Sequence, residues 1–170
     1  MFNILKKIIY LLFSIFFIIV LLFIIDLTDI DNNYVSGPIF EYCIVEYAEH
    51  GLKTQSCGPF INYSEFRYNS EAGVSVWNDD WSSSTPLVWV TRCDIHDNTL
   101  GIKAYATNAA KAVFDYNTVY NNNTKGGIRG EHGVTFSYNT IKNNKYTDQY
   151  GDRKSAGIAV DRCHVKNNFI

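Results

Sequence analysis

One stretch holds the clearest copy of a repeated pattern: Val90-Thr91-Arg92-Cys93-Asp94-Ile95-His96-Asp97-Asn98. Around Cys93, an apolar residue lies three positions before, a second apolar residue two positions after, and an asparagine five positions after. The pattern occurs six times between Phe40 and Asn168, at steps of 21 to 29 residues. Short β-prone runs with this period, separated by asparagine and glycine turns, predict a solenoid of stacked coils.

The position of Cys93, which we call the slot, holds a small or polar residue in every copy: Cys43, Ser64, Cys93, Asn117, Asn139 and Cys163. The apolar residue two positions later is Val45, Phe66, Ile95, Val119, Ile141 or Val165. Every copy but the first has the asparagine, at Asn69, Asn98, Asn122, Asn144 and Asn168. We expect the apolar residues to stack inside and the asparagines to stack at a recurring corner, where their amides bond to the next coil. Cysteines at equivalent inward positions favour structural thiols over a disulfide framework.

Each repeat has a second run that commonly opens with glycine and an aliphatic residue, as in Gly101-Ile102-Lys103-Ala104. Strand alternation places the aliphatic residue inside and the next residue outside. The expected outward residues are Lys53, Ser75, Lys103 and Arg129, followed two positions later by Gln55, Trp77, Tyr105 and Glu131. The run Gly157-Ile158-Ala159-Val160 is similar but leads directly to the slot at Cys163, so its place in the coil stays open.

With these corners and glycine-aliphatic strands, residues 38–170 resemble the right-handed parallel β-helix repeat family, the pectate-lyase-like (pectin lyase-like) superfamily. The resemblance implies an all-β, right-handed parallel β-helix of about five to six coils. Because the chain stops within a repeat, we expect the C-terminus to be incomplete. In this family, polysaccharide is typically bound along one outward strand face and its flanking loops.

A nearly unbroken apolar run occupies residues 8–25. As a helix it would be about 27 Å long, close to the hydrocarbon thickness of a bilayer. Lys6 and Lys7 precede it, so the positive-inside rule places the N-terminus in the cytoplasm and the repeats outside, at the cell surface or in the periplasm. No small-x-small cleavage site follows, which favours an uncleaved signal-anchor over a cleaved signal.

The predicted organisation is therefore a cytoplasmic stub and transmembrane helix over residues 1–26, a linker over residues 27–37, and the repeats over residues 38–170. The net charge of -2 gives no basic surface for nucleic acid. The expected partners are a polysaccharide or cell-surface glycan and, through residues 8–25, the membrane.

The outward strand face and the loop after Trp77 are the places where a ligand is expected. Aromatic rings stack on sugar faces, and cations neutralise uronate carboxylates. The expected ligand-binding residues are Trp77, Trp81, Lys103, Tyr105 and Arg129. Asp79 and Asp80 lie between two tryptophans, where they could hold Ca²⁺ or act as acid and base. A solvated turn is the favoured interpretation of this loop, so no metal or other cofactor is predicted unless the chain is a lyase.

Catalytic candidates are few: Arg129, Glu131, His132, Asp79 and Asp80. The segment Gly130-Glu131-His132-Gly133 faintly resembles the Gly-His-Gly of polygalacturonases, but the rest of that pattern is absent. In lyases of this family an arginine beside Ca²⁺-binding acids removes the proton α to a uronate carboxylate, and Arg129 is best placed for that role. A turn histidine is the favoured interpretation of His132.

The sequence thus favours a membrane-anchored extracytoplasmic module that binds cell-surface carbohydrate or presents to it. The alternative is a polysaccharide lyase or glycoside hydrolase that acts on acidic polysaccharide. An enzyme needs acids or bases clustered on one strand face, whereas a binding module needs only aromatic and polar groups. The sequence leans towards the binding module.

Overall fold

The computed structural model describes residues 37–78, 87–107, 112–147, 153–155 and 157–170. They belong to one compact unit, Val35–Ile170, and every regular element among them is a β-strand. No helix in this described part is long and apolar enough to cross a membrane. The anchor predicted at residues 8–25 lies outside the described residues and stays a prediction.

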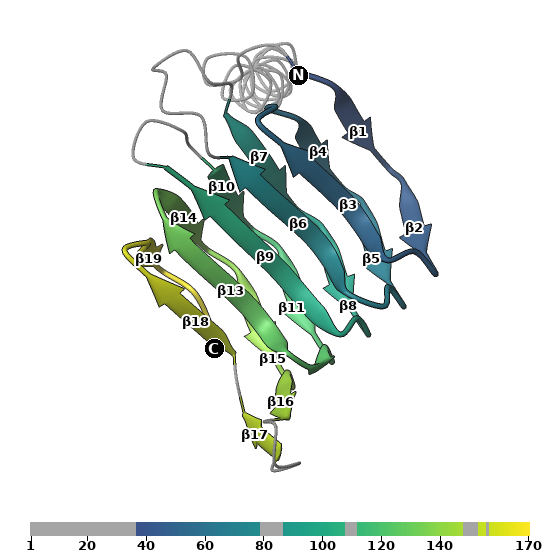
Figure 1. Ribbon diagram of the computed structural model, residues 1–170, viewed down its shortest axis with the longest axis vertical. Coiled ribbons are helices and arrows are strands. Elements are labelled where there is room, and N and C mark those ends of the chain that lie inside the picture. Colours follow the sequence, from purple (N-terminus) through teal and green to yellow (C-terminus); the bar gives the residue numbers. More distant parts are fainter. Residues whose placement is uncertain (1–36, 79–86, 108–111, 148–152, 156) are drawn as a thin grey trace, which may run out of the picture. The chain divides into compact units, whose positions relative to one another are not determined.

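The strands form three parallel sheets that wind as a solenoid (Figure 1). Sheet 1 contains β1 (Ile39–Glu41), β4 (Phe60–Asn62), β7 (Val88–Thr91), β10 (Ala112–Asp115), β14 (Val134–Ser137) and β19 (His164–Lys166). Sheet 2 contains β2 (Ile44–Glu46), β5 (Glu65–Arg67), β8 (Asp94–His96), β11 (Thr118–Tyr120) and β15 (Thr140–Lys142). Sheet 3 contains β3 (His50–Gln55), β6 (Ala72–Asn78), β9 (Leu100–Ala106), β13 (Gly126–His132) and β18 (Ile158–Asp161). The all-β parallel solenoid predicted from the repeat is confirmed.

The core is made of like residues stacked from coil to coil. Each sheet points alternate residues inward, so equivalent apolar positions meet across the ladder. In sheet 1, for example, Phe114 pairs in register with Val90 and Phe136, and the two phenyl rings stack at 5.3 Å. Both rings are fully buried. The inward positions predicted from the sequence are confirmed for Val74, Ile95, Ile102, Val119 and Ile141 among others.

Asparagines form two ladders, one at each of two corners. At the corner between sheets 2 and 3, the backbone N–H and side-chain amide of Asn98 both donate to Asn122 Oδ1, at 3.0 and 3.1 Å. The same two bonds continue this ladder from Asn122 to Asn144. The slot forms the second ladder, between sheets 1 and 2, where Asn117 donates to Asn139 in the same way. The predicted asparagine corner is therefore confirmed and has a counterpart at the slot.

The prediction is wrong for the last copy. Val165 pairs with Phe136 of sheet 1, not with Ile141, and the ladder partner of Asn139 is Asn168. Asn168 therefore occupies the slot, and Cys163 lies outside it. The strand β18 resolves the open assignment of Gly157-Ile158-Ala159-Val160, because Ile158 pairs with Ile128 in sheet 3. The sequence pattern predicts the slot at Cys163, but the strand β19 lies between Cys163 and the slot at Asn168.

All four cysteines are free thiols. Cys93 lies in the slot as predicted, and its backbone N–H donates to Asn117 Oδ1 at 2.9 Å. Burial raises the pKa of its thiol to about 12, which keeps it protonated and unreactive at neutral pH. Burial also raises the pKa of Cys163. Cys93 thus serves as a small buried group, and Cys163 is partly buried.

The glycines that open the strands of sheet 3 make room for the asparagine ladder. A Cβ built on Gly101 would collide with the carbonyl oxygen of Gly127 and lie 2.8 Å from Asn122 Nδ2. Gly51 and Gly73 meet the equivalent groups of their own next coils. Space, and not an unusual backbone angle, therefore explains the recurrent glycine.

A small accessory sheet extends the corner between sheets 2 and 3. It contains β12 (Asn123–Thr124), β16 (Lys145–Thr147) and β17 (Arg153–Ser155), and β16 and β17 pair antiparallel. Figure 1 shows β16 and β17 beyond the end of the stacked strands. The segment that follows β15 thus contains two strands that pair with each other.

Candidate functional site

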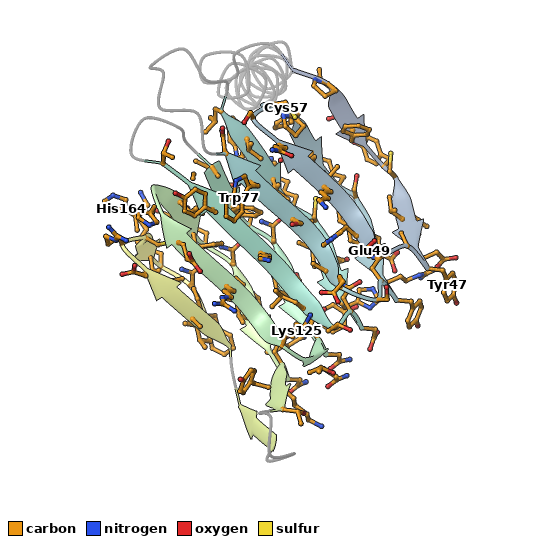
Figure 2. All side chains as sticks on the ribbon, in the orientation of Figure 1. Tyr47, Glu49, Cys57, Trp77, Lys125 and His164 are labelled. Atoms are coloured by element: carbon orange, nitrogen blue, oxygen red, sulfur yellow. The ribbon has the colours of Figure 1, made fainter. Side chains whose placement is uncertain are left out.

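Two rows of outward side chains run across sheet 3, as strand alternation predicted. We call this surface the sheet 3 face. The register places Lys53, Ser75, Lys103, Arg129 and Ala159 in one row, and Gln55, Trp77, Tyr105, Glu131 and Asp161 in the other. Figure 2 shows Trp77 on β6 of this sheet. The structure therefore brings four of the five predicted ligand-binding residues onto one face: Trp77, Lys103, Tyr105 and Arg129.

The two aromatic residues of the face stack on each other. Trp77 and Tyr105 lie on adjacent strands with ring centroids 4.5 Å apart and planes 17° from parallel. Trp77 is still 44% exposed. Since the facing surfaces of the rings are occupied, only the ring edges and outer surfaces are left for contact with a ligand. Sequence alone predicted rings that stack directly on sugar faces and did not indicate this pairing.

The neighbouring row is cationic. Lys53, Lys103 and Arg129 are all exposed, and Lys103 and Arg129 are direct neighbours in register. Arg129 forms an ion pair with Glu131, with an Nε–Oε1 distance of 3.6 Å and both side chains largely exposed. A pair this open in water contributes little stability, so the guanidinium remains available to a ligand.

The three predicted catalytic residues of β13 lie together at one end of the face. His132 is in the left-handed conformation (φ 62°), as a turn residue, and its ring meets the edge of Tyr105 at 5.2 Å. Arg162 Nη2 donates to His132 Nε2 at 2.8 Å. An additional carboxylate, Asp161, pairs in register with Glu131. Sequence reasoning missed Asp161 because the last copy had been placed in the wrong strand.

The loop after Trp77 contains the remaining predicted site residues. Asp79, Asp80 and Trp81 lie outside the described residues, so the proposed Ca²⁺ or acid-base role of that loop stays a prediction. Among the described residues, no group of three or more histidines, cysteines, aspartates and glutamates could hold a metal ion.

Sheet 2 contains a hydrogen-bonded charge network that sequence reasoning also missed. His96 is nearly buried, with Nε2 2.9 Å from Glu65 Oε1 and Nδ1 2.7 Å from Asp97 Oδ2. Arg67 donates to Glu65 and Glu46, at 2.7 and 2.6 Å. The signal was available, because Glu65, Arg67 and His96 occupy alternate outward positions of β5 and β8.

Tyr120 covers the imidazole of this network. Its ring stacks on His96 with centroids 4.6 Å apart and planes 13° from parallel. Burial raises the pKa of Tyr120, and the carboxylates of Asp94, Asp97 and Glu65 add to the shift. The phenol is therefore neutral at physiological pH. The network fixes the position of the Asp97 carboxylate at the corner between sheets 2 and 3.

The network makes stability depend on pH through Glu65. Burial alone would raise the pKa of Glu65, but hydrogen bonds from His96 and Arg67 bring it below the ordinary value of 4.5. The stabilisation is therefore complete above that ordinary value and is lost as the pH falls through the lower pKa of the folded state. We expect the urea midpoint of the wild type to fall over this acidic range. Glu65→Gln should show a smaller fall, measured by circular dichroism.

The matched control is Glu49→Gln, since the Glu49 side chain is 74% exposed. This variant should follow the wild type across the whole pH range. An unchanged pH dependence in Glu65→Gln would contradict the assignment of the acid-sensitive stability to this network.

Comparison with known proteins identifies the family. A family model described as a right-handed beta helix region matches residues 28–170. No curated protein and no solved structure matches the chain at a significant level. The match spans most of the chain and agrees with the three parallel sheets and the stacked coils. The chain therefore belongs to the right-handed β-helix family.

Proposed function

We propose that this domain binds an extended acidic polysaccharide along the sheet 3 face, as a carbohydrate-binding module of the cell envelope. The observation that supports this most directly is the cationic row beside the Trp77–Tyr105 pair. The proposal includes the predicted anchor at residues 8–25, which would hold the domain at the outer side of a membrane.

The spacing of the cations suits a polymer. Strands in a sheet lie about 4.8 Å apart, so Lys103 and Arg129 are separated by one such step and Lys53 and Lys103 by two. Charges repeated along a straight line match a chain that has a carboxylate on successive sugar units. A small anion would contact only one of them. The geometry therefore favours a linear ligand laid across the strands.

The described acidic residues near the cationic row do not neutralise the charges of Lys53 and Lys103. Lys125 Nζ is 2.6 Å from Glu71 Oε2, and this hydrogen bond is the main cause that lowers the pKa of Glu71. Glu71 is thus held in an ion pair with Lys125 at the edge of the sheet. Lys53 and Lys103 have no ion pair with any described residue, which leaves both ammonium groups for uronate carboxylates.

Binding of polygalacturonate, measured by isothermal titration calorimetry with the full-length protein, tests the proposal. Lys103→Ala combined with Arg129→Ala should weaken binding by roughly tenfold for each cation removed. Raising the salt concentration should weaken binding of the wild type, because exposed charges are screened. Lys166→Ala, which removes a cation from sheet 1, is the control and should bind as the wild type does.

Fully methyl-esterified polygalacturonate separates charge recognition from general sugar binding. The ester keeps the sugar ring and removes the carboxylate, so we expect binding to be lost. Equal binding of the acid and ester forms would overturn the proposal. Loss of binding in Trp77→Ala, with the cations intact, would show that the aromatic pair also contacts the ligand.

A glycoside hydrolase is the second candidate, and one specific observation favours it. Glu131 and Asp161 pair in register on adjacent strands, which puts the Cα atoms of two acidic residues about one strand spacing apart on the same face. Retaining glycosidases use carboxyl groups about 5 to 5.5 Å apart. New reducing ends from an acidic polysaccharide, lost in Glu131→Gln and in Asp161→Asn, would support this function. Binding without product would support the binding module.

A further inference from the structure

A polar groove lies at the corner between sheets 2 and 3, away from the rows of the sheet 3 face. Its volume is about 530 Å³, and it is lined by Asp97, Asn121, Asn123, Asn143, Asn144 and Lys145. This volume is within the range of about 300 to 1,000 Å³ that small-molecule sites occupy. The lining is almost wholly amide and charged groups, so the groove suits a ligand with many hydroxyl groups.

The fold builds the groove from one repeated position. Asp97, Asn121 and Asn143 follow the last residues of β8, β11 and β15, and all three adopt the left-handed conformation (φ 53 to 55°). The left-handed conformation alone does not explain why these three positions hold short polar residues. Tyr47 and Tyr68 hold the equivalent place in the first two coils, with φ values of 60° and 55°. Short polar side chains therefore begin at the coil where the groove begins.

The side chains that line the groove are largely unused by the fold. Asn144 belongs to the buried ladder and donates to Val119 O at 3.0 Å. In contrast, the side-chain amides of Asn121 and Asn143 and the ammonium group of Lys145 make no hydrogen bond to any described residue. Asn123 Nδ2 donates to the backbone carbonyl of Asn121, which leaves its own amide oxygen free. The groove thus presents both donors and acceptors.

The charges of the groove select the class of ligand. Asp97 and Lys145 have opposite charges, so the site as a whole is neutral. A divalent cation would be repelled by Lys145, and an anion by Asp97. The carboxylate of Asp97 is held by His96 at 2.7 Å, so it cannot swing away from an incoming anion without breaking that bond. A neutral sugar avoids both penalties and uses the amides as hydrogen-bond partners.

We propose that this groove binds a neutral sugar unit through Asn121, Asn143 and Asp97. This site is separate from the sheet 3 face, and the inference does not rest on the function proposed above. The sugar hydroxyls would accept from the amide N–H groups and Lys145, and donate to the amide oxygens and to Asp97.

Saturation-transfer NMR with the full-length protein tests the groove, using cellotriose, maltotriose and tri-N-acetylglucosamine as probes. We expect transfer to at least one of these neutral sugars. Asn121→Gly combined with Asn143→Gly removes both amides while glycine keeps the left-handed backbone. This variant should weaken binding at least tenfold. Asn167→Gly is the matched control, because Asn167 has the same conformation (φ 54°) and lies outside the groove.

Further measurements separate the possible outcomes. Lys103→Ala with Arg129→Ala should leave binding of the neutral sugar unchanged, whereas the groove variant should leave binding of polygalacturonate unchanged. No transfer to any of the three sugars would overturn the inference. Transfer that survives in the groove variant would overturn it too. Saturable binding of Ca²⁺ or inorganic phosphate that the groove variant abolishes would also contradict it, because it would make the groove an ion site.

Discussion

Asn122→Ala is expected to unfold the domain or leave it barely stable. Asn122 is fully buried, and its side chain joins three coils. Nδ2 donates to Ile95 O at 3.1 Å and to Asn144 Oδ1 at 3.0 Å, and Oδ1 accepts from Asn98. Alanine would remove the acceptor of the buried Asn98 N–H and a donor to the buried Ile95 carbonyl. At about 1 to 3 kcal/mol for each of these two groups, the loss is on the order of 2 to 6 kcal/mol.

The free energy of unfolding, measured by urea denaturation, checks this result. A loss of that size is a large part of the roughly 5 to 15 kcal/mol typical of a domain. Asn123→Ala is the matched control, since Asn123 is the next residue, is exposed and makes one local bond. It should change stability by less than about 0.5 kcal/mol. Equal effects of the two substitutions would show that the ladder does not stabilise the fold.

Gly101→Ala should be nearly as damaging, although it adds only one methyl group. The new Cβ would lie 2.6 Å from Val119 Cγ1 and 2.8 Å from Asn122 Nδ2, and it would collide with the Gly127 carbonyl. The amide is fixed by the asparagine ladder, so it cannot move without breaking hydrogen bonds to neighbouring coils. Overpacking costs about 1 to 3 kcal/mol and more when the backbone must shift.

Thermal unfolding of Gly101→Ala should therefore show a lower midpoint than the wild type by many degrees. Lys103 lies on the same strand with its side chain in solvent. Lys103→Ala should therefore unfold at the same midpoint as the wild type. A normal midpoint for Gly101→Ala would mean that the coils can separate slightly without loss of stability, and that the glycines have another role.

The fold was predictable because its physical determinants recur in the sequence. Inward residues such as Ile95, Ile102 and Val119 alternate with polar ones, and each buried asparagine returns at the same place in its coil. The last copy was misplaced because the letters around Cys163 fit the slot pattern as well as those around Asn168 do. Only the register settles the choice, through the pairing of Ile158 with Ile128 and the bond between Asn139 and Asn168.

The site was less predictable because it depends on neighbours across coils. Alternation correctly placed Trp77, Lys103, Tyr105 and Arg129 on one face. It could not show that Trp77 and Tyr105 stack on each other, since that requires the exact register and side-chain conformation. The pairing of Glu131 with Asp161 was lost with the misplaced last copy.

The groove and the network of sheet 2 were missed for a different reason. Asp97, Asn121 and Asn143 each directly precede a ladder asparagine, and the repeat pattern assigned no meaning to that position. Their left-handed conformation turns the side chain away from the core, which the order of residues does not reveal. His96 likewise gains its partners from two directions, Asp97 beside it in the chain and Glu65 in the previous coil.

The parallel register also makes the length of each sheet proportional to the number of coils. Every coil adds about 4.8 Å to all three sheets at once, whatever the length of the insertions between its strands. Duplication of one whole coil would lengthen the cationic row by one step and leave the groove unchanged at its own coil. The number of coils would then set how many sugar units of a polymer the sheet 3 face spans, independently of the affinity at each step.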